Sequence, residues 1–590
     1  MEVDFEHRCH LTMQVKHCNY IMNFFNYFEI MYCSIDIQSK LEERLIMGLF
    51  GIIMILLTIM IGHLVDKYIE PALKILSVKM YMSEYLAGVT LLSLGNSFAD
   101  LIVNLMPIRG HAPIYTISLS NALAVILLSG GMVCFLRPFK LNGHSVIRDL
   151  LFLLLAAELT IYMIFSDTKT TKPESISLAL LYPIYLFVLF VDHNLLHEAI
   201  STLYKEIDEL QNQPYTPRRK DLIKEKLKKL HEFEQEVRVV VHNNSIIYRY
   251  NSSNLETYWR DYRKQMSNWE IQNIQKMDEN ITRNILYNFH NPKNMFLFEE
   301  FLTALIPINI VDWKFSGWCH RIFLIILSPI ALFCAIFIPI VDYRQDKHGW
   351  SKLLNCTQII TNPILCFVLV EAMFNNTYTK RYPVLTLTNA IWTLWFTVPL
   401  AILVFFHSRT DRPPTYHLLF LSLTVVSSML FLAICATELE VLFAIIGLVF
   451  HMTEDFVASS IRSLAGAMGD VIFNTHLAMH GYEKMAFAAS LAAPLFIITV
   501  CIGIPCYFNS QVHKTESAHW LYGIYGENSY IFFTMAIFTA LGWTLTLNFS
   551  ARRSVGIFSY ILFMLFLLFN ALAEWDLIHE MARDKIFKPI

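Results

Sequence analysis

Residues 87–105 read AGVTLLSLGNSFADLIVNL, an apolar run with polar residues near its middle. Because about 20 apolar residues suffice to cross a bilayer, the run is predicted to form a membrane-spanning helix. A carboxylate at the centre of such a helix costs roughly 2.5–3.5 kcal/mol on insertion scales. Asn96, Ser97 and Asp100 are therefore candidate functional residues, and Asp100 is the costliest of the three.

The composition extends this interpretation to the whole chain. Of its 590 residues, 55% are hydrophobic and 16% are charged, whereas soluble domains carry about 25% charged residues. We therefore expect an all-α polytopic membrane protein in a lipid bilayer. The net charge of −3 does not indicate a nucleic-acid partner. The sequence lacks a P-loop lysine motif, and we expect no enzymatic activity.

Thirteen apolar segments have the length and flanking residues of membrane spans. They are residues 45–66, 83–106, 113–135, 147–167, 174–192, 319–342, 355–374, 387–406, 416–438, 455–478, 484–507, 529–547 and 553–573. The first five and the last five form two halves. If the halves are inverted repeats, an even number of spans must lie between them. The segment 355–374, with Asn362, Pro363 and Glu371, is the weakest candidate, so we expect 12 or 13 spans.

The same pattern divides the chain into five regions. They are an outward-facing amino-terminal segment (1–44), a first membrane region (45–192), an inner-side polar regulatory or spacer loop (193–318), additional membrane segments (319–406) and a second membrane region (407–590). Basic residues in the short loops place the polar loop on the inner side. Within it, residues 218–240 have the apolar spacing of an amphipathic helix, which either packs on its own loop or is a regulatory or membrane-surface helix. Cys9, Cys18 and Cys33 allow one disulfide or none.

The two halves share an internal repeat. When residues 82–105 are aligned with 452–475, an offset of 370, seven of 24 positions are identical. Chance similarity of apolar helices explains shared Leu and Ile, but not shared acids and amides in one register. The shared acids and amides are Glu84/Glu454, Asp100/Asp470 and Asn104/Asn474, and the hydroxyl of Thr90 faces that of Ser460.

Each repeat therefore has an acid at the membrane boundary, a hydroxyl six residues later and an acid deep in the span. Paired halves with polar, interrupted helices are typical of secondary transporters with an ion site near the midplane. Two carboxylates with hydroxyl and amide oxygens suit Ca²⁺ or Na⁺. Glu84 and Glu454 are either a cation-recruiting entrance or solvated helix ends.

These motifs resemble the alpha repeats of sodium/calcium exchangers. AGVTLLSLGNSFADL matches the first repeat (about 83–135), and ASSIRSLAGAMGDVIFNTHLAMHGYEKMAFAASLAAPLF looks like the second (about 453–507). The best match is the cation/calcium exchanger branch, and it extends over nearly the whole chain. The resemblance implies two inverted five-helix halves that exchange Ca²⁺ against Na⁺ or another monovalent cation (H⁺, Li⁺ or K⁺), with no cofactor. It implies metal ligands at Asp100 and Asp470, assisted by Thr90, Asn96, Ser97, Ser460 and either Ser120 or Asn121.

The sequence also departs from the pattern of this family. Ala99 replaces a proline, Gly466 and Ala467 replace an asparagine and a serine, and Ile497 replaces an asparagine. Arg462 stands at an apolar position, where its charge either competes with a bound cation or pairs with a site acid. These departures keep an alternative open, a transport-inactive paralogue that regulates or binds another membrane protein. A conducting channel fits the repeats less well.

The resemblance and the amino terminus indicate different membranes. The branch includes mitochondrial exchangers, which implies the mitochondrial inner membrane. The sequence MEVDFEHRCHLTMQVKHC, however, has neither the apolar core of a signal peptide nor the Arg-rich character of a presequence. The plasma membrane or an endomembrane is therefore the alternative, and the sequence does not determine the oligomeric state.

Overall fold

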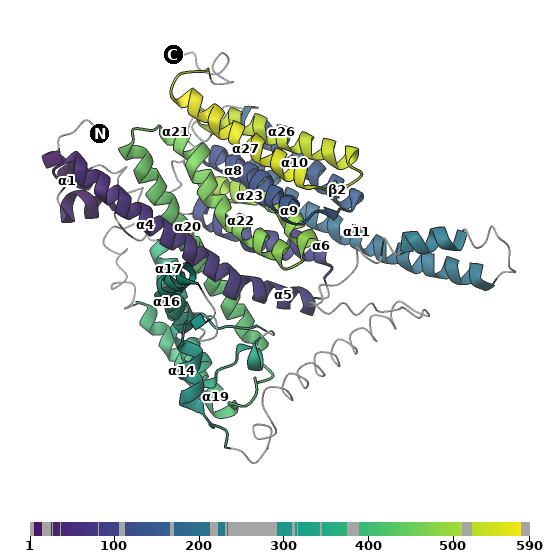
Figure 1. Cartoon of the computed structure of the whole chain (residues 1–590), viewed down its shortest axis with the longest axis horizontal. Helices are drawn as coiled ribbons and strands as arrows, with labels where there is room; N and C mark the ends of the chain where they lie inside the picture. Colours follow the sequence, from purple (N-terminus) through teal and green to yellow (C-terminus); the bar gives the residue numbers. More distant parts are fainter. Residues whose placement is uncertain are drawn as a thin grey trace.

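The computed structural model shows an almost entirely helical chain (Figure 1). It describes residues 5–14, 25–105, 113–165, 170–212, 222–230, 233, 292–374, 389–509 and 522–579, apart from 26, 36, 81, 309–312, 315–316 and 343–344. Within these residues one small sheet occurs, in which β1 (Phe139–Lys140) pairs antiparallel with β2 (Ser550–Ala551). Because β1 and β2 belong to different halves, the sheet joins the two halves at one edge.

Each half contains a series of long helices. The first half comprises α4 (Lys40–Leu64), η2 (Val65–Ile69), α5 (Glu70–Lys79), α6 (Glu84–Ala87), η3 (Gly88–Leu92), α7 (Ser93–Leu105), α8 (Ile114–Ala124), η5 (Val125–Gly130), α9 (Gly131–Leu136), α10 (Gly143–Phe165) and α11 (Lys172–Asn212). The second half comprises α20 (Leu418–Val449), α21 (Glu454–Val457), η9 (Ala458–Arg462), α22 (Ser463–Met479), α23 (Glu483–Phe508), α26 (Gly526–Thr546) and α27 (Arg553–Glu574). Here η2, η3, η5 and η9 are π-helical turns.

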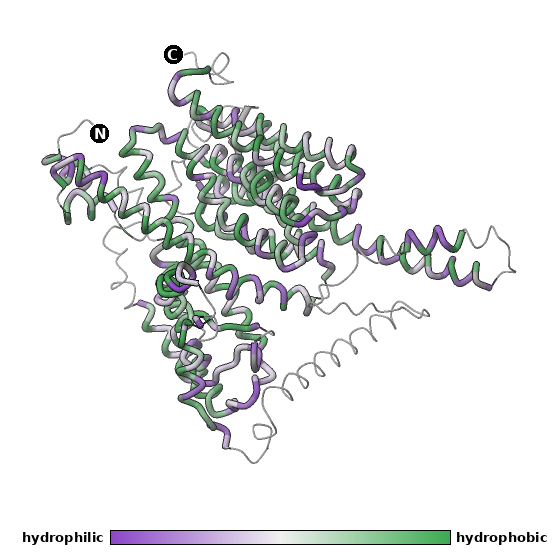
Figure 2. Tube along the Cα trace, viewed as in Figure 1, coloured by the Kyte–Doolittle hydropathy of each residue, from purple (hydrophilic) through white to green (hydrophobic). Residues whose placement is uncertain are grey.

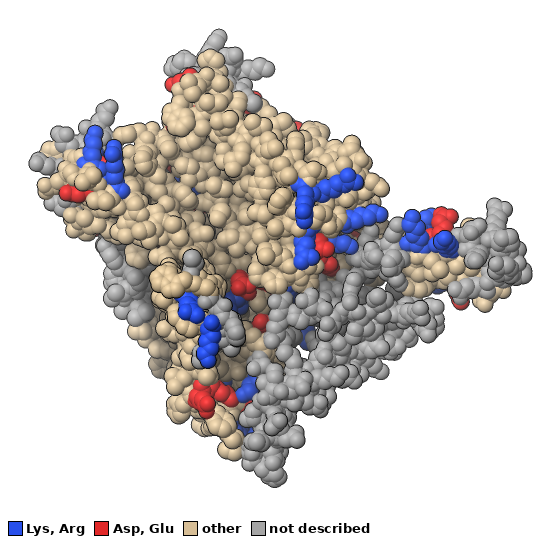
Figure 3. Space-filling view, viewed as in Figure 1, with Lys and Arg blue, Asp and Glu red and all other residues tan. Residues whose placement is uncertain are grey.

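Eleven helices among the described residues are long and apolar enough to cross a membrane, which confirms an integral multi-pass membrane protein. They do not include α10, whose 23 residues carry Arg148, Asp149 and Glu158. Figure 2 shows that the bundle is mostly hydrophobic along its helices. On the face seen in Figure 3, charged residues gather toward the edges and leave a broad uncharged area over α22, α26 and α27.

The segment predicted to be weakest is a full-length helix, so that prediction was wrong. Between the halves lie α14 (Leu297–Leu305), α16 (Trp318–Phe337), η6 (Asp346–Gly349), α17 (Lys352–Phe374), η8 (Ile391–Thr393) and α19 (Leu394–His407). The polar residues of α17 bind the last carbonyls of α16: Gln358 Nε2 donates to Ala335 O at 2.7 Å, and Asn362 Nδ2 donates to Phe337 O at 3.0 Å. Such partners satisfy the end of a helix. The shorter apolar helix is instead Ile391–His407.

The two repeats have the same local structure, residue for residue. Ser83 and Thr453 each cap a helix by accepting a hydrogen bond from the backbone N–H three residues later. A four-residue helix follows in each copy (α6 and α21), then a five-residue π-helical turn (η3 and η9), then a long helix (α7 and α22). The offset of 370 is kept at each boundary from the capping residue to the start of the long helix, so the similarity of the two sequences extends to their backbone geometry.

The two repeat helices run in opposite directions. The end of α22 lies beside residues that precede the first repeat, since His476 Nε2 is 2.7 Å from Asp66 Oδ1. The segment 522–525 contacts both Asp455, at the start of the second repeat, and Thr116, which follows the first repeat helix in the sequence. The start of the second repeat therefore lies near the end of the first repeat helix. In Figure 1, α6 and α21 accordingly lie at opposite ends of the bundle. This is the arrangement that inverted repeats require.

The core of the bundle is formed around α23. This helix is buried along almost its whole length, and it packs against α7, α8, α10, α11 and α22. Gly88 allows the closest approach, because a Cβ there would lie 2.3 Å from Met485 O. Helices from both halves therefore share one hydrophobic core.

Segments outside the two halves dock on the bundle. The amino-terminal elements α1 (Phe5–Gln14), α3 (Tyr27–Glu29) and η1 (Ile30–Ser34) pack near the ends of α4 and α20, and a disulfide joins Cys9 to Cys33. Cys18 and most of the polar loop lie outside the described residues. Of the expected amphipathic helix, 222–230 is helical, and Leu230 packs against Ile200 and Ile207 of the long α11. The described part thus packs on its own loop.

Candidate functional site

The contact between α7 and α22 brings polar residues of the two repeats together. The Asn96 side chain on α7 interacts with the Asp470 carboxylate on α22. The contact is loose, because neither Asn96 Nδ2 nor Asp470 Oδ1 has a well-formed hydrogen bond, although both atoms are buried. Asp470 is only 3% exposed. A buried carboxylate oxygen without a hydrogen bond is costly and calls for an explanation such as a bound ion.

A third residue reaches this site from α8. A Cβ built on Gly466 would lie 3.1–3.3 Å from the side-chain atoms of Asn121. Gly466 precedes Asp470 by one turn of α22, so the two lie on the same face of the helix. Asn121 is buried, and its Oδ1 also lacks a hydrogen-bond partner. Asn96, Asn121 and Asp470 therefore form one polar cluster, built from two helices of the first half and one of the second.

Two other predicted ligands donate hydrogen bonds to the backbone one turn earlier in the chain. The hydroxyls of Thr90 and Ser460 both donate within their own helix, to Leu86 O and Phe456 O respectively. They lie in the π-helical turns η3 and η9. Each hydroxyl keeps its lone pairs, because a donated proton leaves an oxygen able to accept or to coordinate.

Two of the predicted hydroxyl ligands contact other helices. Ser97 Oγ lies 3.5 Å from Ala493 O of α23, and Ser120 Oγ lies 2.7 Å from Ser529 Oγ of α26. Ser120 is therefore used between α8 and α26. Of the two alternatives in the first repeat, Asn121 is the one that reaches the face of α22.

The remaining charged candidates lie elsewhere along the two repeats. Asp100 is half-buried, follows Asn96 by one turn of α7 and lies close enough to the Cys501 thiol to interact with it. Arg462 is the last residue of η9 and is half-buried. Glu84 and Glu454 begin α6 and α21, and Glu454 is exposed. The role of Asp100 as the partner of Asp470 stays a prediction.

Comparison with known proteins assigns the family. The family model for the sodium/calcium exchanger protein matches residues 50–191 and 420–572, which together make up half of the chain. These two stretches contain both repeats and the whole polar cluster. The chain belongs to the sodium/calcium exchanger family.

Individual exchangers resemble the chain over most of its length. The mitochondrial sodium/calcium exchanger protein of Gallus gallus is 23% identical over 526 residues, which cover 86% of this chain and 78% of the relative. The Homo sapiens protein of the same name is 23% identical over 518 residues, with the same coverage. Cation/calcium exchanger 2 of Arabidopsis thaliana is 22% identical over 519 residues, 85% of this chain and 77% of the relative. No solved structure matches.

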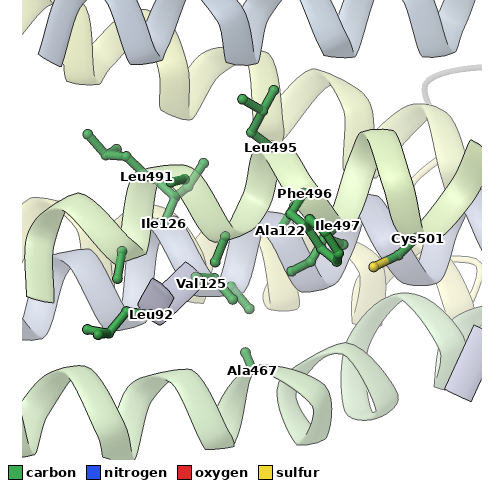
Figure 4. Packing of buried hydrophobic residues seen from close by; sticks show 14 of the residues in the cluster. Leu92, Ala122, Val125, Ile126, Ala467, Leu491, Leu495, Phe496, Ile497 and Cys501 are labelled. Carbon is green, nitrogen blue, oxygen red and sulfur yellow. The ribbon is translucent and has the colours of Figure 1, made fainter. Parts of the chain in front are cut away.

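In this member of the family, two departures from the family pattern lie in the hydrophobic core. Ala467 and Ile497 are both at most 1% exposed and belong to one apolar cluster with Val125. Figure 4 shows Ala467 of α22 and Ile497 of α23 among packed apolar side chains that include Val125 of η5. The positions at which the family pattern has serine and asparagine are thus filled by packed hydrocarbon. The polar cluster consequently draws two of its three residues from the first half.

Sequence reasoning missed two features. The π-helical turns η3 and η9 leave no mark in an apolar periodicity, although π-turns are frequent at functional sites. A second polar group, Glu70, His476 and His480, has its possible ligand atoms within 4.8 Å of one another. The spacing of four between the two histidines was the available signal, but Glu70 is remote in the sequence.

Proposed function

We propose that the chain is a secondary active antiporter that exchanges Ca²⁺ against Na⁺ across a membrane and contributes to calcium homeostasis. The observation that carries the proposal is the meeting of Asn96, Asn121 and Asp470 across the two halves. Membership in the exchanger family supports it. The name of the vertebrate relatives favours a mitochondrial membrane. H⁺, Li⁺ and K⁺ are alternative counter-ions.

Asp470 supplies the charge of the proposed site, and the amide oxygens complete it. Carboxylate and amide oxygens are hard ligands that suit Ca²⁺ and Na⁺. Asp100, one turn beyond Asn96, is the second carboxylate of the proposal. Exchange follows if the same oxygens hold Ca²⁺ and Na⁺ in turn while the antiparallel repeats α7 and α22 open the site to one side or the other.

The test is Ca²⁺ flux into proteoliposomes that contain the purified full chain. An imposed Na⁺ gradient should drive Ca²⁺ movement in the wild type, and Asp470→Asn should lower this flux to near the background while the protein still elutes as a folded species. Ca²⁺ flux that ignores Na⁺, H⁺, Li⁺ and K⁺ gradients would refute the exchange mechanism. A folded wild type without any flux would instead support the inactive paralogue.

A further inference from the structure

A group of metal-binding side chains lies away from the proposed transport site, where the end of α22 meets η2 and α5. Glu70, His476 and His480 each offer one ligand atom, and these atoms lie within 4.8 Å of one another. His476 lies six residues beyond Asp470, and at 1.5 Å per residue the two are about 9 Å apart along the helix. The group is therefore a separate site.

The hydrogen bonds around His480 leave one ring nitrogen available to a metal. His480 Nδ1 is 2.9 Å from the backbone oxygen of His476. A carbonyl oxygen can only accept, so Nδ1 carries the proton and Nε2 keeps its lone pair. Metal-ligating histidines commonly fix their tautomer in this way, through a bond from the other nitrogen. The side chain of His480 is exposed, so a metal ion can reach Nε2 from water.

His476 is arranged similarly, with Asp66 as its orienting partner. Its Nε2 is 2.7 Å from Asp66 Oδ1, and its Nδ1 contacts Glu70 Oε2. If Nε2 of a neutral His476 donates to Asp66, its Nδ1 carries no proton, and the Nδ1 lone pair faces Glu70 Oε2. Two acceptors in contact repel each other unless a proton or a cation lies between them. The arrangement therefore requires either a protonated His476 or a bound metal ion.

The second oxygen of Glu70 is already held. Lys74 donates to Glu70 Oε1, which orients the carboxylate and leaves Oε2 toward the histidines. Glu70 itself is buried, at 2% exposure. Hydrogen-bonded carboxylates of this kind are usual around metal ions. The positive charge of Lys74 repels a metal ion bound at Glu70, which lowers the metal affinity of the three ligands.

From these contacts we propose that Glu70, His476 and His480 bind a divalent transition-metal ion of the Zn²⁺ class, with water as the fourth ligand. Two imidazoles and one carboxylate are a common ligand set for Zn²⁺. Tetrahedral Zn²⁺ would hold Nδ1 and Oε2 about 3.4 Å apart, which needs a small rotation of the Glu70 carboxylate. Imidazole ligands disfavour Ca²⁺ and Na⁺, so the site is distinct from the transported ions. A bound ion would join the end of α22 to the start of α5.

The test is equilibrium binding of ZnCl₂ to the purified full chain, which requires no transport. The wild type should bind Zn²⁺, and His480→Ala and His476→Ala should each weaken this binding at least tenfold. Millimolar Ca²⁺ should not displace the Zn²⁺. The matched control is His193→Ala with His197→Ala, a second pair four residues apart whose Nε2 atoms are 3.1 Å apart. Zn²⁺ affinity of the control should stay within twofold of the wild type.

Thermal unfolding distinguishes metal binding from ion pairing of His476 with Asp66 and Glu70 alone. Zn²⁺ should raise the melting temperature of the wild type and leave that of His480→Ala unchanged, since a ligand stabilises the state that binds it. Without metal, His480→Ala should melt like the wild type, because the side chain is exposed. Unchanged Zn²⁺ affinity in His480→Ala, or no binding to the wild type, would overturn the proposal and leave a protonated His476 between two carboxylates.

Discussion

The two repeats have the same backbone but different polar residues. Both begin with a capped turn, continue through a π-helical turn and end in a long helix. In the first repeat the positions before the acid are Asn96 and Ser97, and in the second they are Gly466 and Ala467. The first pair offers side-chain oxygens. In the second pair, Gly466 leaves room for the Asn121 side chain, and Ala467 packs in the hydrophobic core. Backbone symmetry therefore does not require a symmetric site.

The largest expected effect comes from the acids that the two repeats share. Asp470→Asn should lower Na⁺-driven Ca²⁺ flux roughly 100-fold, since a loss of about 2.7 kcal/mol of binding free energy corresponds to that factor. Asp100→Asn should do the same if both repeats supply a carboxylate. The measurement is flux in proteoliposomes at matched protein amounts. A full effect at Asp470 with none at Asp100 would show that the site is one-sided.

The next effect concerns the space that Gly466 leaves for Asn121. Gly466→Ala should lower flux roughly tenfold, because a methyl group 3.1–3.3 Å from Asn121 must displace that side chain. The matched control is Gly469→Ala on the same helix, where a Cβ has no atom within 4 Å. Gly469→Ala should stabilise α22 by roughly 0.5–1 kcal/mol through helix propensity, whereas crowding of Asn121 offsets this gain in Gly466→Ala. Equal flux in the two variants would contradict the role of Asn121.

A smaller effect is expected at Arg462, which has an apolar residue as its counterpart in the first repeat, Leu92. Arg462→Leu should raise the apparent Ca²⁺ affinity on the order of threefold, because it removes a like charge from a low-dielectric region. The measurement is the Ca²⁺ concentration that gives half-maximal flux, with Arg462→Lys as the charge-retaining control. Lower affinity in Arg462→Leu would mean that the arginine is needed to hold a site acid in place.

The smallest effect should follow from removal of the polar loop, which belongs to neither repeat. Deletion of 205–290 should leave membrane insertion intact and change basal flux by no more than about twofold, since the described part of this loop packs on the extension of α11. Insertion is measured by membrane fractionation and flux as above. Loss of insertion would show that the loop contributes to the fold, not only to regulation.

Several features could be predicted from residues that are close in the sequence. Segment length and composition placed most spans correctly, because hydrophobicity over about 20 residues is a local property. The offset of 370 was visible for the same reason, as a shared local pattern of acids and hydroxyls. The error at 355–374 arose because its polar residues bind the end of α16, a partner that sequence spacing does not reveal.

The sequence by itself thus determined the membrane class, the repeat and the two acids that the repeats share. Only the tertiary structure decided that Ser120 turns to α26, that Asn121 lies against Gly466, and that Glu70 meets His476 and His480. Side-chain contacts between remote helices depend on how those helices are rotated and packed against one another. Helical periodicity predicts which residues share a face, but not which neighbouring helix that face meets.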